Sequence, residues 1–484
     1  MEDLDIRLIT KRSIQGVLAL VSRTFTIQII SFTASFLLTI LLAPSVFGVF
    51  FVVSAAIAFL SYFSDIGLAA ALIQKKEAIT EKDLKTTFTI QQILVASVVI
   101  ITLFFSKNIG SFYNLDKEGV ILLQVLAIAF FLSSLKTIPS VILERSLKFE
   151  KLVIPQIIEA IFFNVTAVIL AFLGFGIASF TIAVLLRGIS GLITIYIISP
   201  WRIRFGFYKD SAKKLLSFGV PFQLNSFLAL LKDDLLIVYL GKVLPFNQVG
   251  FIGFAQKWAF TPLRLIMDNV IRITFPSFSR LQDSKDVLSR AVEKSIFAAC
   301  FFIFPSLLGL VILAPYFIEI IPKYTKWEPA IFSLAFFAIN AAFSSVSTPL
   351  TNALNAIGKI RITLYLMIFW TIATWVLTPV AVFNFGFNGV AAVSALVSSS
   401  MFLVVYIVKR HVKFNFLRAV IYPLISSFVM GIGVYFLGAQ FVKDIWSLLL
   451  VIASGAILYF AVIFLLARRL IVSDIALIRA NIFK

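Results

Sequence analysis

Long apolar runs separated by short basic segments follow one another along the whole chain, and they restrict its fold more than any other feature. A hydrocarbon layer about 30 Å thick takes roughly 20 helical residues to cross. Of the 484 residues, 61% are hydrophobic and 13% are charged, whereas soluble domains are about half apolar and a quarter charged. The runs are continuous and do not alternate with polar residues, which argues against a membrane β-barrel. The sequence therefore predicts an all-α membrane protein.

By this length criterion we predict about fourteen transmembrane helices. They cover residues 14–42, 47–73, 84–105, 120–143, 152–173, 175–199, 212–240, 249–278, 292–316, 330–356, 362–383, 387–408, 416–437 and 445–467. The segments between them are short, and the largest outer loop, 106–119, leaves no room for a soluble catalytic domain.

The basic residues predict the orientation of the chain in the membrane. Counted together with those in the first three residues of a neighbouring span, Lys and Arg number 29 on the N-terminal side and 6 in the opposite loops. Cytoplasmic loops carry the excess of Lys and Arg, so both termini are expected in the cytoplasm, with the chain in the inner membrane. The net charge of +19 is explained by these loops, and we expect no nucleic-acid partner. The apolar stretch after Arg12 is too long for a cleavable signal peptide.

A faint internal repeat appears at an offset of 202 residues. It relates Lys11-Arg12 to Lys213-Lys214, and Gly48, which follows Pro44, to Gly250, which follows Pro245. Six spans separate the copies, so we expect two six-helix lobes of equal orientation, 1–200 and 201–410, with a central site. Residues 411–484 then form two additional helices and a cytoplasmic tail. Coincidence between basic-flanked hairpins is the alternative.

Charged residues inside the predicted spans mark the candidate site. The basic residues more than five residues from either end of a span are Arg23, Lys136, Arg187, Lys232, Lys257, Arg264 and Arg272, and the acidic ones are Asp65, Glu159, Asp233, Asp234 and Asp268. Each charge at a helix centre costs about 3 kcal/mol, so seven unpaired cations would cost roughly 20 kcal/mol, more than the stability of a typical fold. These cations must pair, reach the interface, or line a hydrated cavity.

Four of these charges follow one face of a single predicted helix. Lys257, Arg264, Asp268 and Arg272 lie within an arc of roughly 80° at about 100° per residue. One carboxylate does not neutralise three cations, so the stripe either binds a ligand, chiefly through Arg264, or forms a ladder of ion pairs in which Asp268 pairs one turn away.

The remaining charges have local alternatives. Arg23 lies too deep to reach the interface and is expected to line a cavity, while Asp65 either pairs with it or takes part in ion coupling. Lys136 and Arg272 lie near the cytoplasmic end, where their side chains can extend to the interface. Arg187 has no acidic neighbour one turn away. Near the outer end of their span, Lys232, Asp233 and Asp234 can neutralise one another, and Glu159 is expected to pair locally or cap.

Several enzyme classes lack their required residues. One Cys and one His exclude an internal disulfide, a Cys/His metal cluster and a catalytic triad away from His411. No G-x-x-x-x-G-K-[ST] occurs, so a P-loop is absent. We predict no enzyme, no cofactor and no metal site. Charges of both signs in an apolar interior favour transport of an anionic substrate.

Several segments together resemble a known family. They are residues 64–68 and 71–75, 143–149 (LERSLKF), 218–221 (FGVP), Asp233, Gly241, 249–251, Ala255, Pro262 and 275–282 (FPSFSRLQ). In order and spacing, over about residues 10–410, the chain resembles Wzx-type polysaccharide flippases of the multidrug/oligosaccharidyl-lipid/polysaccharide (MOP) exporter superfamily.

The resemblance implies a two-lobed protein that flips a polyprenyl-diphosphate-linked oligosaccharide by alternating access through a cationic cavity. By position, Arg23 and Arg264, with Lys257 and Arg272, would contact diphosphate and sugar, and the last two spans would hold the lipid tail. Lys136 and Arg187 are further cavity candidates. Membrane lipids, a polysaccharide polymerase and glycosyltransferases are candidate partners.

Three other functions stay open at this point. A cation-coupled multidrug exporter of the same superfamily usually has twelve spans and acidic residues for cationic drugs. An intramembrane polymerase or ligase normally needs a large outer loop with its own polar cluster. A structural scaffold would not explain the charged stripe.

Overall fold

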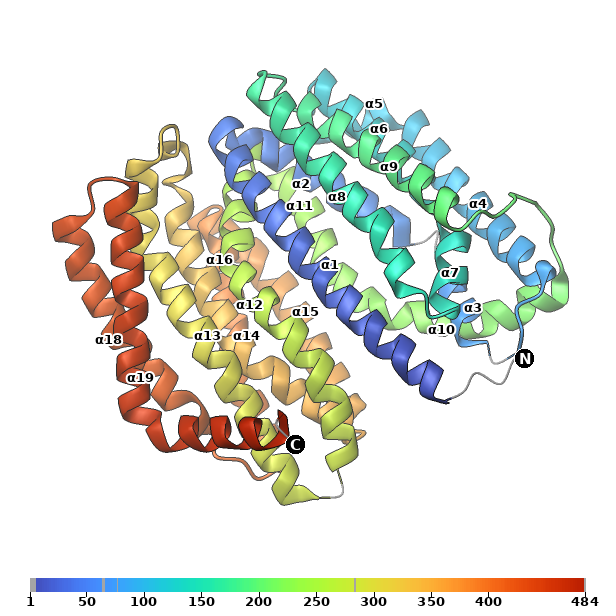
Figure 1. Cartoon of the computed structure of the whole chain (residues 1–484). Coiled ribbons are helices and arrows are strands. Elements are labelled where there is room, and N and C mark those ends of the chain that lie inside the picture. The colour runs from blue at the N-terminus through green and yellow to red at the C-terminus, as the bar shows by residue number, and fades with distance from the viewer. Residues whose placement is uncertain (1–5, 63–65, 76, 283, 483–484) are drawn as a thin grey trace. The chain divides into compact units, whose positions relative to one another are not determined.

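The computed structural model describes residues 6–62, 66–75, 77–282 and 284–482. Within these ranges the regular elements are α-helices and one short 3-10 helix, and no strand occurs (Figure 1). The prediction of an all-α membrane protein is confirmed. The chain divides into two compact units, Met1–Gly250 and Phe251–Lys484, each described below by itself.

The first unit contains eleven complete helices among the residues that the structure describes. They are α1 (Ile6–Leu41), α2 (Pro44–Tyr62), α3 (Leu68–Gln74), α4 (Glu81–Phe104), α5 (Ser106–Tyr113), α6 (Lys117–Ser134), α7 (Thr137–Arg145), α8 (Phe149–Phe172), α9 (Ala178–Ile198), α10 (Lys209–Lys232) and α11 (Asp234–Val243). Helix α8 packs against both α1 and α9, and α6 packs against α9 and α4. Figure 1 shows α1, α8 and α9 side by side.

The second unit holds the rest of the helices. Helix α12 (Phe246–Leu281) begins at the end of the first unit and continues into the second, followed by α13 (Lys285–Ile320), the 3-10 helix η1 (Thr325–Trp327), α14 (Ala330–Ala356), α15 (Ile360–Phe385), α16 (Asn388–Ser398), α17 (Met401–Lys409), α18 (Phe416–Phe441) and α19 (Ile445–Ile482). Trp327 is fully buried and stacks on Phe254 of α12, with ring centroids 4.3 Å apart.

Twelve spans in the described residues are long and apolar enough to cross a membrane. They coincide with twelve of the fourteen predicted spans. The other two predictions coincide with α10–α11 and α12, whose polar and charged residues make them less apolar. These helices carry four of the seven intramembrane cations, so the count of about fourteen is consistent with the structure.

Several predicted spans contain two helices each. Predicted span 47–73 consists of α2 and α3, which begins after Gly67 in a left-handed conformation (φ 66°). Predicted spans 120–143, 212–240 and 387–408 are likewise split, at 135–136, at Asp233 and at 399–400. The predicted outer loop 106–119 contains the short helix α5. Hydropathy detects apolar content and not a local change of backbone direction, so these breaks were not predicted.

Two glycine pairs allow helices of the first unit to touch through their backbones. A Cβ atom on Gly48 of α2 would lie 1.8 Å from the carbonyl oxygen of Phe246, and one on Gly250 would lie 2.0 Å from that of Pro44. Gly48 and Gly250 are the two positions related by the 202-residue offset, and they contact each other's helix reciprocally. Gly67 and Gly219 approach in the same way at the break between α2 and α3.

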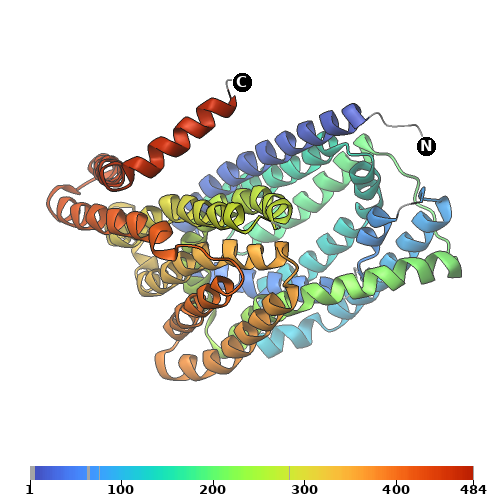
Figure 2. The same ribbon diagram turned by 90° about the horizontal axis from the view of Figure 1, so that it is seen from below.

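The two C-terminal helices form a pair that packs on α13. Helix α18 contacts both α13 and α19 along its length. Ala467, where the last predicted span ends, has non-helical angles (φ −110°, ψ 19°), and α19 changes direction there (Figures 1 and 2). The helix continues from this kink to Ile482, where the sequence predicted a tail.

Candidate functional site

Arg23 is held by a polar residue of a neighbouring helix in the first unit. Its Nη1 donates a hydrogen bond of 2.6 Å to Oε1 of Gln156 on α8. Nη2 donates to Thr24 Oγ1 at 3.2 Å. The Arg23 side chain is half-buried on α1, whose packing against α8 places Gln156 within reach. The predicted partner Asp65 lies outside the described residues.

Lys136, Glu159 and Arg187 form a charged cluster in the same unit. Lys136 Nζ lies 2.5 Å from Oε1 of Glu159 on α8, and Arg187 Nε of α9 lies 3.6 Å from Oε2 of the same carboxylate. Lys136 sits where α6 ends and α7 begins. A Cβ on Gly191 would lie 1.9 Å from the Glu159 carboxylate, so this glycine makes the space that the carboxylate occupies.

The cluster keeps an excess of positive charge. One carboxylate faces two cations, and the Arg187 side chain is 57% exposed while those of Lys136 and Glu159 are 15% and 13% exposed. The Arg187 guanidinium carbon also lies 5.9 Å from the centre of the Phe163 ring, a cation–π contact. A half-exposed guanidinium in an apolar helix requires water or a polar ligand beside it, because lipid would leave its donors unsatisfied.

Sequence reasoning missed the partner of Arg187. Its own helix α9 has no acidic residue one turn away, and Glu159 reaches it from α8. Pairing of Glu159 was expected from the sequence, but not that it joins two cations. Three elements meet at this point, and a search for charges along one helix does not detect such a meeting.

A second charged group lies at the break between α10 and α11. Lys232 Nζ is 3.7 Å from Oδ1 of Asp233, and the two side chains are 34% and 66% exposed. Asp234 is the first residue of α11 and is partly buried. The expected neutralisation within this group is therefore present between Lys232 and Asp233.

The charged face of α12 is exposed in the second unit. Lys257, Arg264 and Asp268 all have exposed side chains. Arg264 and Asp268 are one turn apart, yet no ion pair within 4.0 Å joins them among the residues that the structure describes. Arg272 lies on the same helix, and its side chain falls outside the described part of the chain. An ion pair between Arg264 and Asp268, one form of the ladder that was the alternative to ligand binding, is therefore absent from the described residues.

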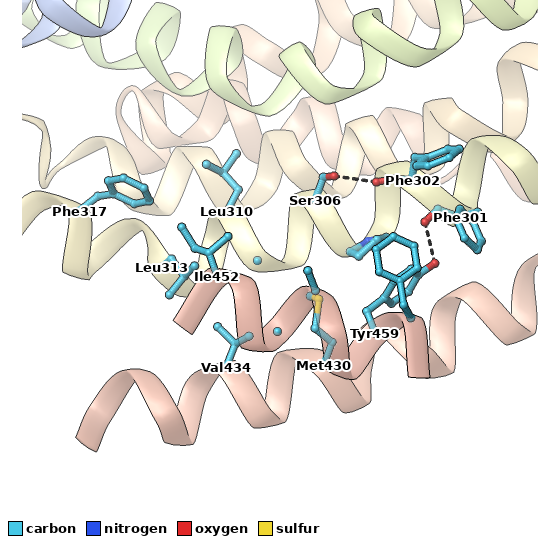
Figure 3. A pocket seen from close by; sticks show the side chains of 15 residues that line it. Phe301, Phe302, Ser306, Leu310, Leu313, Phe317, Met430, Val434, Ile452 and Tyr459 are labelled. Atoms are coloured by element: carbon cyan, nitrogen blue, oxygen red, sulfur yellow. Dashed lines mark hydrogen bonds between the residues drawn. The ribbon is translucent and has the colours of Figure 1, made fainter. Parts of the chain in front are cut away.

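Two apolar cavities lie in the second unit, beside the C-terminal helices. One of about 360 Å³ is lined by α13, α18 and α19 (Figure 3). Its two hydroxyl groups are satisfied internally, since Tyr459 donates to the Phe301 carbonyl at 2.6 Å and Ser306 to the Phe302 carbonyl at 2.7 Å. The other, of about 550 Å³, is lined by α13, α14, α17 and α18. Walls of this kind suit a hydrocarbon chain.

Comparison with known proteins assigns the chain to a family. The sequence pattern of the polysaccharide biosynthesis protein family matches residues 37–331. The chain belongs to this family. The chain is 25% identical over 423 residues to the teichuronic acid biosynthesis protein TuaB of Bacillus subtilis, covering 84% of each. It is 22% identical over 447 residues to the succinoglycan biosynthesis transport protein ExoT of Rhizobium meliloti, covering 89% of this chain and 88% of that one.

A solved structure of another protein has a fold similar to that of this chain. The lipid II flippase MurJ, in an inward-closed conformation, aligns with a TM-score of 0.76 at 17% identity. The alignment covers 95% of this chain and 100% of MurJ. The expected resemblance to polysaccharide transporters is confirmed by the family match and its relatives, and the likeness to MurJ shows a shared helical fold. The protein is a multi-pass membrane protein.

Proposed function

We propose that this protein flips a polyprenyl-diphosphate-linked oligosaccharide repeat unit across the cytoplasmic membrane for surface polysaccharide biosynthesis. Such a substrate combines a strongly anionic diphosphate, a polar sugar and a long hydrocarbon chain. The observation that carries the proposal is the cationic cluster of Lys136, Glu159 and Arg187, whose two cations exceed its single carboxylate. Half-exposed Arg187 has the donors to bind phosphate oxygens.

The second unit supplies features that match the rest of the substrate. Exposed Lys257 and Arg264 on α12 add positive charge for phosphate and acidic sugars. The apolar cavities beside α18 and α19 suit the polyprenyl tail. The names of the relatives, which refer to teichuronic acid and succinoglycan biosynthesis, and the flippase fold point in the same direction.

The proposal includes an orientation and a mechanism. Both termini lie in the cytoplasm, because Lys and Arg are concentrated on that side. Transport proceeds by alternating access, with Arg23, Lys136, Arg187, Lys257, Arg264 and Arg272 as substrate contacts. Asp65, Asp233, Asp234 and Asp268 pair with nearby cations, as Asp233 does with Lys232, or couple transport to an ion. A polymerase and glycosyltransferases act beside the protein, with substrate delivered on the cytoplasmic leaflet.

The decisive experiment measures movement of a lipid-linked sugar between leaflets. Purified protein is reconstituted into vesicles with a fluorescent polyprenyl-diphosphate disaccharide, and a membrane-impermeant quencher reports the outer-leaflet fraction. Protein-free vesicles should lose about half of the signal, and vesicles with protein nearly all of it. Equal quenching in both would refute the proposal. Transport of a cationic dye in place of the lipid would favour the multidrug exporter.

A further inference from the structure

The Glu159 carboxylate contacts two cations at unequal distances. Oε1 makes a close contact of 2.5 Å with Lys136, whereas Oε2 stands 3.6 Å from Nε of Arg187, beyond hydrogen-bond distance. Within the described residues, the two terminal nitrogens of Arg187 have no hydrogen-bond partner. The cluster is therefore neutralised firmly at Lys136 and only weakly at Arg187.

The surroundings of Glu159 hold the carboxylate close to both cations. Gly191 lies directly against it on α9, and Phe163 of α8 lies beside the Arg187 guanidinium. One turn before Glu159 on α8, Gln156 accepts the hydrogen bond from Arg23. In the described part, the charged groups that contact Gln156 and Glu159 on this stretch of α8 are thus Arg23, Lys136 and Arg187, all of them cationic.

A carboxylate in this position competes with any anion that binds the same cations. Buried cations without a counter-ion are costly, so Glu159 stabilises the cluster when no substrate is present. A phosphate group offers more charge and more acceptor oxygens than one carboxylate, and arginine binds it with two parallel hydrogen bonds. A phosphate that reaches Arg187 can therefore replace the carboxylate as the partner of its guanidinium and then bind Lys136 as well.

We propose that Glu159 is an exchangeable counter-ion, which holds Lys136 and Arg187 in the empty protein and yields them to a phosphate group of the substrate. This inference rests on the proposed function and names Glu159 as a positioning residue. When the carboxylate returns to the two cations, it helps to expel the phosphate. Glu159 thus weakens binding and speeds release, the opposite of what a purely structural ion pair would do.

The test is the affinity of the purified protein for farnesyl diphosphate in phosphatidylcholine nanodiscs, measured by calorimetry. Glu159→Gln removes the competing charge and should bind roughly tenfold tighter than wild type, since like charges at this distance repel strongly. Arg187→Gln and Lys136→Met should each bind roughly tenfold weaker. Glu150→Gln is the matched control, because Glu150 is an exposed carboxylate on the same helix without an ion pair in the described residues, and it should bind as wild type does.

A double variant guards against misfolding of Glu159→Gln. Lys136→Met combined with Glu159→Gln leaves no unpaired charge between these two positions, and it should bind roughly tenfold tighter than Lys136→Met alone. In the vesicle assay, Glu159→Gln should also flip the lipid-linked sugar more slowly than wild type, because tighter binding delays release.

Either of two results would overturn the inference. Binding by Glu159→Gln equal to or weaker than wild type, with the double variant no tighter than Lys136→Met, would assign the carboxylate a structural role. Displacement of farnesyl diphosphate by phosphatidylglycerol at equal concentration would show that the site takes bulk anionic lipid. Both results leave the proposed function intact if wild type still flips the sugar, whereas absence of flipping by wild type refutes the function itself.

Discussion

The reciprocal contact of Gly48 and Gly250 predicts how closely α2 and the start of α12 must pack. A methyl group on Gly48 would lie 1.8 Å from the Phe246 carbonyl oxygen, whereas ordinary contact begins at 3.4 Å. The obstructing atom is backbone, which does not rotate away as a side chain does. Gly48→Ala must therefore move the two helices apart by roughly 1.5 Å in a closely packed interior.

The expected cost follows from two opposing effects. Overpacking of this kind costs about 1–3 kcal/mol, and replacing a helical glycine by alanine returns about 0.5–1 kcal/mol through the unfolded state. The net destabilisation of Gly48→Ala is therefore about 1–2 kcal/mol, and Gly250→Ala should cost a similar amount. Because either methyl group separates the same two helices, the double variant should cost less than the sum of the single ones.

Thermal unfolding of detergent-purified protein, followed by fluorescence, measures this effect. Each single variant should unfold at a midpoint lower by a few degrees, on the order of 2–4 °C. Gly309→Ala is the control, since a Cβ there meets only the end of the Met430 side chain at 3.8 Å, and its midpoint should not fall. Midpoints of Gly48→Ala equal to those of Gly309→Ala, or strictly additive losses in the double variant, would refute the close contact.

Three further predictions test the charged helix, the apolar cavity and an outer loop. Arg264→Glu should abolish polysaccharide export in a complementation assay at normal membrane levels, because it reverses a cation on the exposed face of α12. The control is Arg280→Glu at the end of the same helix, which should leave export unchanged. Export by the Arg264→Glu variant would remove this residue from the mechanism. Ala456→Trp should slow flipping in vesicles several-fold, because it fills the cavity of about 360 Å³. Ala461→Trp, at an exposed position of α19 outside the cavity lining, should leave the rate unchanged. Equal rates for the two variants would show that the cavity does not hold the lipid tail. Burial and the neighbouring Lys323 lower the pKa of Lys326 to about 8. The charged form of Lys326 is therefore disfavoured in the folded protein, and the folded state gains stability as the pH rises past that value. Lys326→Gln should therefore raise the unfolding midpoint at pH 7, with a gain that shrinks by pH 10, and a gain that is independent of pH would contradict this explanation.

The membrane architecture was largely predictable from the amino-acid sequence. Apolar content over about 20 residues is a local property, and a bilayer selects for it directly, so predicted spans such as 330–356 and 416–437 coincide with helices α14 and α18. The charges inside other predicted spans, such as Arg187 and Arg264, were also evident, because a cation is conspicuous in an apolar run.

The tertiary structure decided which of those charges meet. Glu159 contacts Lys136 and Arg187, which belong to two other elements. Arg23 donates a hydrogen bond to Gln156, 133 residues away in the sequence. Arg264 and Asp268, one turn apart on a single helix, do not form the ion pair that their spacing allowed. Hydrophobicity is read residue by residue along the chain, but an ion pair depends on the packing of separate helices to within a few ångströms. That packing depends on details such as the space beside Gly191, which acquire meaning only in the folded protein.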